Sequence, residues 1–144
     1  MNDTGRRPQV VIVCGGRGTR LAPSIGDLPK ILTPLDDRSL LAHLLDDLAT
    51  LGDAEVLLLA GHGGEQVAAE ADRLAPPGLE VTTHVETRPR GTAGALLEVE
   101  DRLHERFLFA CGDVVTSLDW RRLWQAADRR GGLATLLVHR SSHP

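Results

Sequence analysis

The sequence predicts an α/β protein with a Rossmann-like, mostly parallel sheet, and three observations support this prediction. Short apolar runs rich in β-branched residues alternate with segments of helical periodicity along the chain. The first run, VVIVC from Val10, is continuously apolar, which is typical of a strand buried on both faces. A glycine-rich loop follows this run directly, at the edge where open parallel sheets bind their ligands.

The elements follow one another in a regular order. We expect the first strand at residues 10–14 and a long loop from there to about residue 38. Ser39 is the expected N-cap of a helix whose leucines recur at helical spacing, and Gly52 ends that helix. The later elements are expected at residues 55–60 (strand), 65–74 (helix), 79–85 (strand), 92–104 (helix), 107–111 (strand), 117–129 (helix, capped by Ser117) and 133–139 (strand).

This alternation implies about five parallel strands joined by right-handed crossovers, in an order of the 3-2-1-4-5 type, with helices on both faces of the sheet. The 144 residues fit a single domain, residues 1–144. Because the chain ends at Pro144, directly after the fifth expected strand, we expect a truncated fold, the N-terminal part of a larger domain.

Composition and charge exclude several classes of protein. The net charge is −4, and no basic stretch is long enough to form a nucleic-acid surface. No apolar run approaches the roughly 20 residues that cross a membrane. Cys14 and Cys111 have no C-x-x-C spacing, and each ends a strand that neighbours the other in the expected order. We therefore expect a cytoplasmic protein in which these two thiols lie close together and stay reduced.

The glycine loop has the composition of a phosphate site. It reads GGRGTRLAP from Gly15, and three glycines in four positions let the backbone turn tightly and present N–H groups to an anion. Arg17 and the later Lys30 add cations that can contact phosphate oxygens. The loop lacks the G-x-x-x-x-G-K-[ST] pattern of a Walker A loop. It also lacks the third glycine of the dinucleotide fingerprint, because Leu21 stands there.

The pattern G-G-x-G-T-R-L-x-P, followed by P-K at Pro29 and Lys30, resembles the signature of sugar-1-phosphate nucleotidyltransferases. Lys30 stands ten positions after Arg20, and this spacing resembles that of the sugar-specific enzymes. In the molybdenum-cofactor nucleotidyltransferases, the lysine stands closer to the arginine. The resemblance implies that Arg17 binds the β- and γ-phosphates and that Lys30 stabilises the region of the α-phosphate. It also implies a set of residues that surround the nucleotide phosphates, namely Gly15, Gly16, Gly18 and Thr19.

Two further motifs follow in the order that the resemblance implies. Gly91 and Thr92 stand where the third strand leads into a helix, and small residues there permit close approach of a flat group, the nucleobase in this family. Asp113 directly follows the fourth strand, so its carboxylate is expected at the ligand-binding edge. A hard carboxylate suits Mg²⁺, and the resemblance implies that Asp113 holds this metal.

The implied activity is transfer of a nucleoside monophosphate from an NTP to a sugar 1-phosphate, with release of pyrophosphate. The nearest resemblance is to guanylyltransferases acting on mannose 1-phosphate or D-glycero-D-manno-heptose 1-phosphate, which favours GTP. The main alternative is a non-catalytic or truncated module that binds NTP and Mg²⁺ and lacks the sugar site. A dinucleotide-dependent oxidoreductase is a third alternative, against which the missing glycine argues. The sequence is also compatible with a homo-oligomer.

Overall fold

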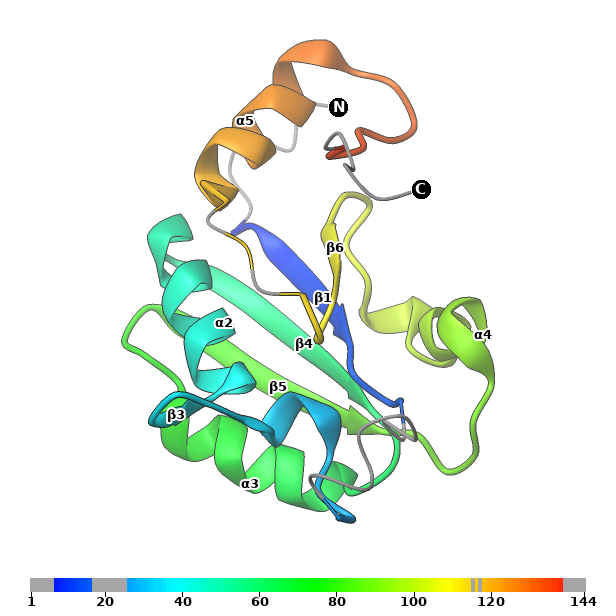
Figure 1. Cartoon of the computed structure of the whole chain (residues 1–144). Coiled ribbons are helices and arrows are strands. Elements are labelled where there is room, and N and C mark those ends of the chain that lie inside the picture. Colours follow the sequence, from blue (N-terminus) through cyan, green and yellow to red (C-terminus); the bar gives the residue numbers. More distant parts are fainter. Residues whose placement is uncertain (1–6, 17–25, 115, 117, 139–144) are drawn as a thin grey trace, which may run out of the picture.

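The computed structural model of the chain describes residues 7–16, 26–114, 116 and 118–138. Four parallel strands form the central sheet in the order β5-β4-β1-β6, and helices pack on both of its faces (Figure 1). The strands of this sheet are β1 (Gln9–Val13), β4 (Ala54–Ala60), β5 (Leu79–Val85) and β6 (Leu108–Cys111). The helices are α2 (Leu40–Leu48), α3 (Gly64–Leu74), α4 (Gly91–Glu98) and α5 (Trp120–Arg130), with 3-10 turns η1 (Lys30–Leu32), η2 (Ala49–Leu51) and η3 (Glu100–Arg102).

The predicted parallel α/β class and the order of the first four predicted strands, 3-2-1-4, are confirmed. The predicted fifth strand at residues 133–139 is wrong for residues 133–138, and His139 lies outside the described residues. Leu133 and Val138 are 108% and 81% exposed, so the apolar run packs on no core. A strand needs a neighbour to pair with, and in the described part of the chain β6 pairs with β1 alone.

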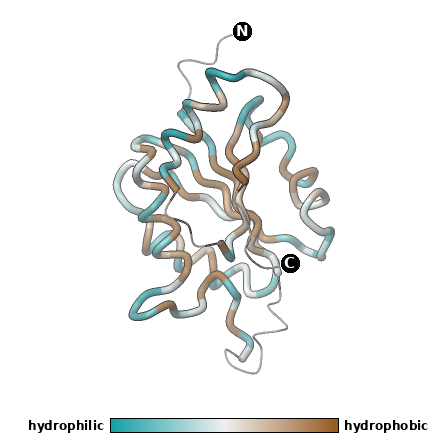
Figure 2. The backbone as a smooth tube through the Cα atoms, turned by 45° about the horizontal axis from the view of Figure 1, so that its top comes forward, coloured by the Kyte–Doolittle hydropathy of each residue, from teal (hydrophilic) through white to brown (hydrophobic). Residues whose placement is uncertain are grey.

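The side chains of β1 alternate between two apolar cores because successive strand residues point to opposite faces of the sheet. Val10 and Ile12 belong to the larger core, which also contains buried residues of α2, α3 and α5. Val11 belongs to the smaller core and packs with Ala95 of α4 and the adjoining Val99. Figure 2 shows the resulting concentration of hydrophobic residues along the central strands. β1 is therefore buried on both faces, as its continuous apolar sequence predicts.

The helix that follows the long loop begins and ends where the sequence predicts. The Ser39 hydroxyl accepts a hydrogen bond from the Ala42 N–H at 3.2 Å, which caps the first turn of α2. Gly52 ends η2 with a φ of 84°, a conformation that favours glycine. Inside the predicted loop, β2 (Pro34–Leu35) and β3 (Arg38–Ser39) form a short antiparallel hairpin that sequence periodicity does not reveal.

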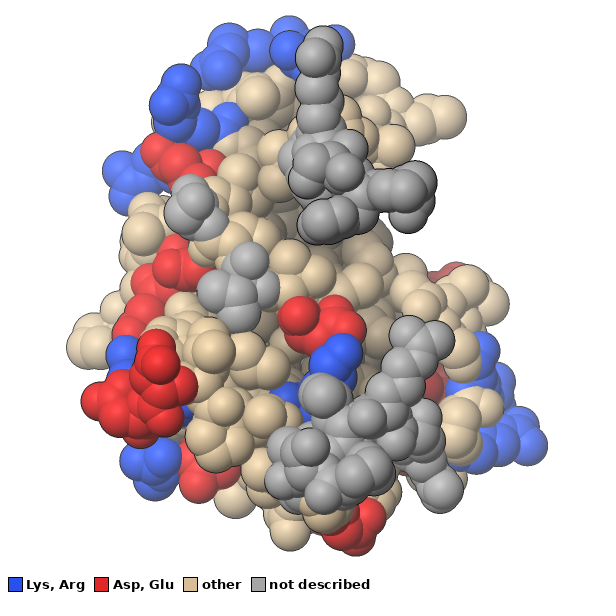
Figure 3. Space-filling model, in the orientation of Figure 1, with Lys and Arg blue, Asp and Glu red and all other residues tan. Residues whose placement is uncertain are grey.

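The two later helices differ from their predicted bounds. α4 ends at Glu98 and is followed by η3, whereas the sequence predicts one helix over residues 92–104. α5 starts at Trp120 with Asp119 as its N-cap, and the Asp119 carboxylate accepts from the Arg122 N–H at 2.9 Å. The predicted cap, Ser117, lies outside the described residues. Basic side chains gather on the exposed surface of α5 (Figure 3), which gives the helix a solvated face.

Among the helices that the structure describes, none combines the length and the apolar character needed to cross a membrane.

Two leucines in helices provide a matched test of this packing. Leu48 of α2 is fully buried, whereas Leu97 of α4 is 68% exposed. We expect Leu48→Ala to lower the free energy of unfolding by about 2–5 kcal/mol, because it leaves a cavity in the larger core. Leu97→Ala should change it by less than about 0.5 kcal/mol. Urea denaturation followed by circular dichroism measures both, and equal losses would contradict the assigned core.

Candidate functional site

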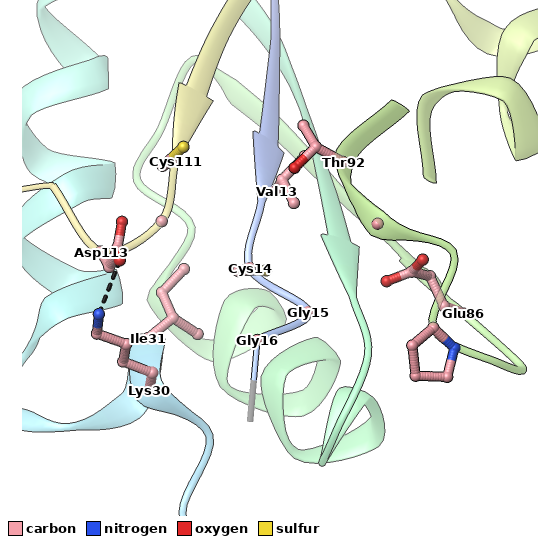
Figure 4. Close-up of a pocket in the computed structure, with 13 residues that line it drawn as sticks. Val13, Cys14, Gly15, Gly16, Lys30, Ile31, Glu86, Thr92, Cys111 and Asp113 are labelled. Carbon is pink, nitrogen blue, oxygen red and sulfur yellow. Dashed lines mark hydrogen bonds and ion pairs between the residues drawn. The ribbon is translucent and has the colours of Figure 1, made fainter. Parts of the chain in front are cut away.

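A pocket of about 440 Å³ opens at the carboxyl edge of the sheet, between the ends of β1 and β6 and the start of α4 (Figure 4). This is the edge at which ligands bind in open α/β sheets. Six residues singled out in the sequence line it: Gly15, Gly16, Lys30, Gly91, Thr92 and Asp113. Three others of that set, Arg17, Gly18 and Thr19, lie outside the described residues.

Strand pairing brings these segments together. β1 pairs in parallel with both β4 and β6, with Val13 opposite Leu59 on one side and Cys111 on the other. The pairing continues for one more bond on each side, because the Cys14 N–H donates to the Leu59 carbonyl and the Gly112 N–H donates to the Val13 carbonyl, both at 2.9 Å. The chain segments that follow β1, β4 and β6 therefore leave the sheet side by side.

Glycines occupy the places where these segments approach most closely. A Cβ atom on Gly61, which follows β4, would lie 2.7 Å from the Gly15 carbonyl oxygen. A Cβ atom on Gly112 would lie 2.9 Å from both Cys14 Cβ and Ile31 Cδ1. Both distances are shorter than non-bonded carbon and oxygen atoms tolerate. Packing alone therefore requires small residues here, whatever ligand the loop binds.

The two predicted charged groups on the phosphate side form an ion pair. The Lys30 ammonium from η1 donates to the Asp113 carboxylate at 2.7 Å, although the residues are 83 positions apart in the sequence (Figure 4). The Lys30 hydrogen bond lowers the pKa of Asp113 from its ordinary value, with a smaller opposing effect of partial burial. Both side chains remain partly exposed, so each is accessible to a ligand in the pocket.

Asp113 fits a magnesium ion only if the ligand supplies most of the coordination. Within the residues that the structure describes, no cluster of three or more His, Cys, Asp or Glu side chains could hold a metal. Mg²⁺ commonly binds through one or two carboxylates and takes its other ligands from phosphate and water. A single, partly exposed carboxylate beside a pocket large enough to admit a ligand with several phosphates matches this second kind of site.

Glu86 is a pocket residue that sequence reasoning did not single out. It directly follows β5, much as Asp113 follows β6 with only Gly112 between, and this position after a strand is the signal that could have identified it. Figure 4 shows its carboxylate on the side of the pocket opposite the Lys30–Asp113 pair. One of its oxygens, Oε1, is buried and has no hydrogen-bond partner within the described residues. Burial raises the pKa of Glu86, and the nearby Glu98 carboxylate raises it further.

The two cysteines also line the pocket, but the strand register does not bring their thiols together, because Cys111 stands opposite Val13 whereas Cys14 packs with Ile12 on the other face of the sheet. Both are present as free thiols. Cys14 is buried and its Sγ donates to the Leu59 carbonyl at 3.4 Å. Burial, with a smaller contribution from Glu86, raises the pKa of the Cys14 thiol to about 12. Cys14 is therefore a protonated packing residue at neutral pH and not a nucleophile.

Comparison with known proteins defines the family. The profile of the MobA-like NTP transferase domain matches residues 10–144, and the chain belongs to this family. Over 147 residues it is 31% identical to the mannose-1-phosphate guanylyltransferase catalytic subunit beta of Drosophila pseudoobscura pseudoobscura, covering 97% of this chain and 39% of the relative. Over 115 residues it is 31% identical to the D-glycero-alpha-D-manno-heptose 1-phosphate guanylyltransferase of Campylobacter jejuni, covering 80% and 52%.

A solved structure shares the fold. HddC from Yersinia pseudotuberculosis superposes with a TM-score of 0.73 at 26% identity, covering 83% of this chain and 54% of the HddC chain.

A uridylyltransferase is also similar in sequence. AglF of Haloferax volcanii is 33% identical over 105 residues, covering 73% of this chain and 43% of AglF. The chain thus spans about half, or less, of the length of these relatives. The predicted resemblance to sugar-1-phosphate nucleotidyltransferases is confirmed at the level of the family.

Gly15 and Gly16 allow the packing role of the loop to be separated from its ligand role. A Cβ atom on Gly15 would lie 2.5 Å from Glu86 Oε2 and 3.1 Å from the Gly61 nitrogen, whereas one on Gly16 would meet no atom of the described residues within 4 Å. We expect Gly15→Ala to lower the free energy of unfolding by about 1–3 kcal/mol through overpacking. Gly16→Ala should change it by less than about 0.5 kcal/mol. Thermal and urea denaturation test this, and a more damaging Gly16 variant would contradict the geometry.

Proposed function

We propose that the chain carries the nucleotide-binding part of a sugar-1-phosphate nucleotidyltransferase, which transfers an NMP from an NTP to a sugar 1-phosphate and releases pyrophosphate. The observation that carries this proposal is the pocket in which Gly15, Gly16, Lys30 and Asp113 meet at the carboxyl edge of the sheet. Membership of the family and the names of the similar guanylyltransferases support it. We also propose a cytoplasmic location, where thiols such as Cys14 and Cys111 stay reduced.

The reaction needs positioning and charge stabilisation more than covalent help from the protein. An oxygen of the sugar phosphate attacks the α-phosphorus, and the bond from that phosphorus to the oxygen bridging the β-phosphorus breaks, so that pyrophosphate leaves with the electron pair. Lys30 stabilises the charge that develops around the α-phosphate, and Arg17 stabilises the leaving pyrophosphate. The backbone N–H groups of the glycine loop, with Gly18 and Thr19, bind the remaining phosphate oxygens.

Asp113 would hold Mg²⁺, which supplies Lewis-acid stabilisation of the phosphate oxygens when it is bound. In the structure, however, Asp113 is occupied by Lys30. With Mg²⁺ and nucleotide bound, Asp113 would hold the metal and Lys30 would be free to contact the α-phosphate. Neither side chain would then be left without a counter-charge, so we expect the metal and the nucleotide to favour each other's binding.

The other side of the pocket fits a nucleobase. Gly91 and Thr92 leave open space there for a flat group, since a Cβ atom on Gly91 would meet no atom within 4 Å in the described part of the chain. The Glu86 carboxylate can accept two parallel hydrogen bonds, and guanine presents two adjacent N–H donors on its Watson–Crick edge. Adenine and uracil each present a single donor there, beside acceptors that a carboxylate repels. We therefore propose GTP as the preferred donor substrate.

The direct test of the proposed activity is pyrophosphate release in the presence of Mg²⁺, measured with a panel of NTPs and sugar 1-phosphates. We expect release with GTP and a manno-configured sugar 1-phosphate, and loss of the Mg²⁺-dependent part of GTP binding in Asp113→Ala, measured by calorimetry. GTP·Mg²⁺ binding without any pyrophosphate release would support the alternative of a non-catalytic NTP-binding module. An Asp113→Ala variant with unchanged Mg²⁺ dependence would rule out its role as metal ligand.

The change in GTP affinity at low pH tests the role of Glu86. Its pKa is raised above the ordinary glutamate value of about 4.3, so the carboxylate takes up a proton as the pH falls through that raised pKa. Protonation removes one of the two acceptors, and GTP affinity should fall in this range. Glu86→Gln should bind GTP about tenfold more weakly at neutral pH and lose this pH dependence. Protonation of the GTP phosphates affects the wild-type chain and the variant equally. If Glu86→Gln loses GTP affinity at low pH in the same way as the wild-type chain, the proposed role of Glu86 in base recognition is wrong.

A further inference from the structure

Glu98, the last residue of α4, holds two side chains from different elements. Its Oε1 accepts from Arg90 Nε at 2.7 Å, and its Oε2 lies 3.2 Å from His84 Nε2. Only 16% of the Glu98 side chain is exposed. A carboxylate at the C-terminal end of a helix is unfavourable by itself, because the partial charge of that end is also negative. The partners at Arg90 and His84 offset this cost, so Glu98 differs from a solvated surface acid.

Gly94 makes the contact between Arg90 and Glu98 possible. Arg90, Gly94 and Glu98 are spaced four residues apart, so they follow one face of α4. A Cβ atom on Gly94 would clash with Arg90 Cβ. The missing side chain therefore lets Arg90 lie along the helix and reach Glu98 two turns further on. Gly94 thus serves the contact with Arg90, unlike Gly91 and Thr92 at the start of the helix, which line the pocket.

The two partners of Glu98 flank the loop that forms the nucleobase side of the pocket. His84 lies near the end of β5, and Arg90 immediately precedes α4. Between them stand Glu86 and Pro89, which both line the pocket, and Gly91 and Thr92 follow directly. Glu98 does not line the pocket itself. By holding both ends of this loop against one helix, it limits where Glu86 can place its carboxylate.

We propose that Glu98 is a positioning residue for the nucleobase side of the pocket, acting through Arg90 and His84 to fix the loop that carries Glu86. This inference rests on the proposed function, since it assumes that the pocket binds a nucleotide with its base at Glu86. It also predicts an effect of its own: loss of Glu98 weakens recognition of the base and leaves recognition of the phosphates unchanged.

The test compares two probes by calorimetry in the presence of Mg²⁺. GTP engages both sides of the pocket, whereas inorganic tripolyphosphate engages the phosphate side alone. We expect Glu98→Gln to weaken GTP binding about fivefold to tenfold and to change tripolyphosphate binding by less than about twofold. Glu100→Gln is the matched control, because it removes the same charge from an exposed position two residues away. It should bind both probes like the wild-type chain.

Gly94→Ala disturbs the same contact from the Arg90 side. Alanine favours the helix more than glycine does, but its Cβ atom would overlap Arg90 Cβ and displace Arg90 from Glu98, so we expect some loss of stability and compare the two probes at a temperature where the variant is folded. We expect the same selective loss of GTP binding as in Glu98→Gln. Equal losses for GTP and tripolyphosphate, or no loss for GTP in Glu98→Gln, would overturn the positioning role. Failure of the wild-type chain to bind GTP would refute the proposed function and this inference with it.

Discussion

The parallel pairing of β1 with both of its neighbours is the constraint on which the site depends. It sets the register in which Val13 stands opposite both Leu59 and Cys111. The segments after the three strands therefore leave the sheet at one edge, where they crowd so closely that glycines are required at the contacts. The glycine loop, Lys30 and Asp113 meet only because this register holds, and the two apolar cores on either face of β1 hold it.

The pocket has two chemically different sides. One side carries the ion pair of Lys30 and Asp113, and the other carries Glu86, whose charge is disfavoured by burial and by a neighbouring acid. Lys30 is the one cation in the described lining, against two carboxylates. A polyphosphate gains little net attraction from these three charges alone. A divalent cation held by Asp113 would remove this imbalance, because it would offset the carboxylate and leave Lys30 free for the phosphates.

Local patterns predicted the four strands of the central sheet and the Ser39 cap, because each depends on a few neighbouring residues. The order of these strands was predicted from the alternation of strands and helices along the chain. The fifth strand failed because the apolar residues at 133–138 have no neighbouring strand or core, which local pattern does not reveal. The site was predicted as a set of separate motifs. The pairing of Lys30 with Asp113 depends on residues 83 positions apart, and the role of Glu86 depends on the packing of a loop. Neither leaves a periodic signal in the sequence.

Nucleotide binding at the carboxyl edge of the sheet can be tested by an amide NMR titration with GTP·Mg²⁺. This binding site predicts chemical-shift changes that concentrate at Gly15, Gly16, Thr92 and Gly112, around the pocket. Changes centred instead on the smaller cavity beside Gln9, at the opposite edge of the sheet, or no saturable change at all, would contradict it.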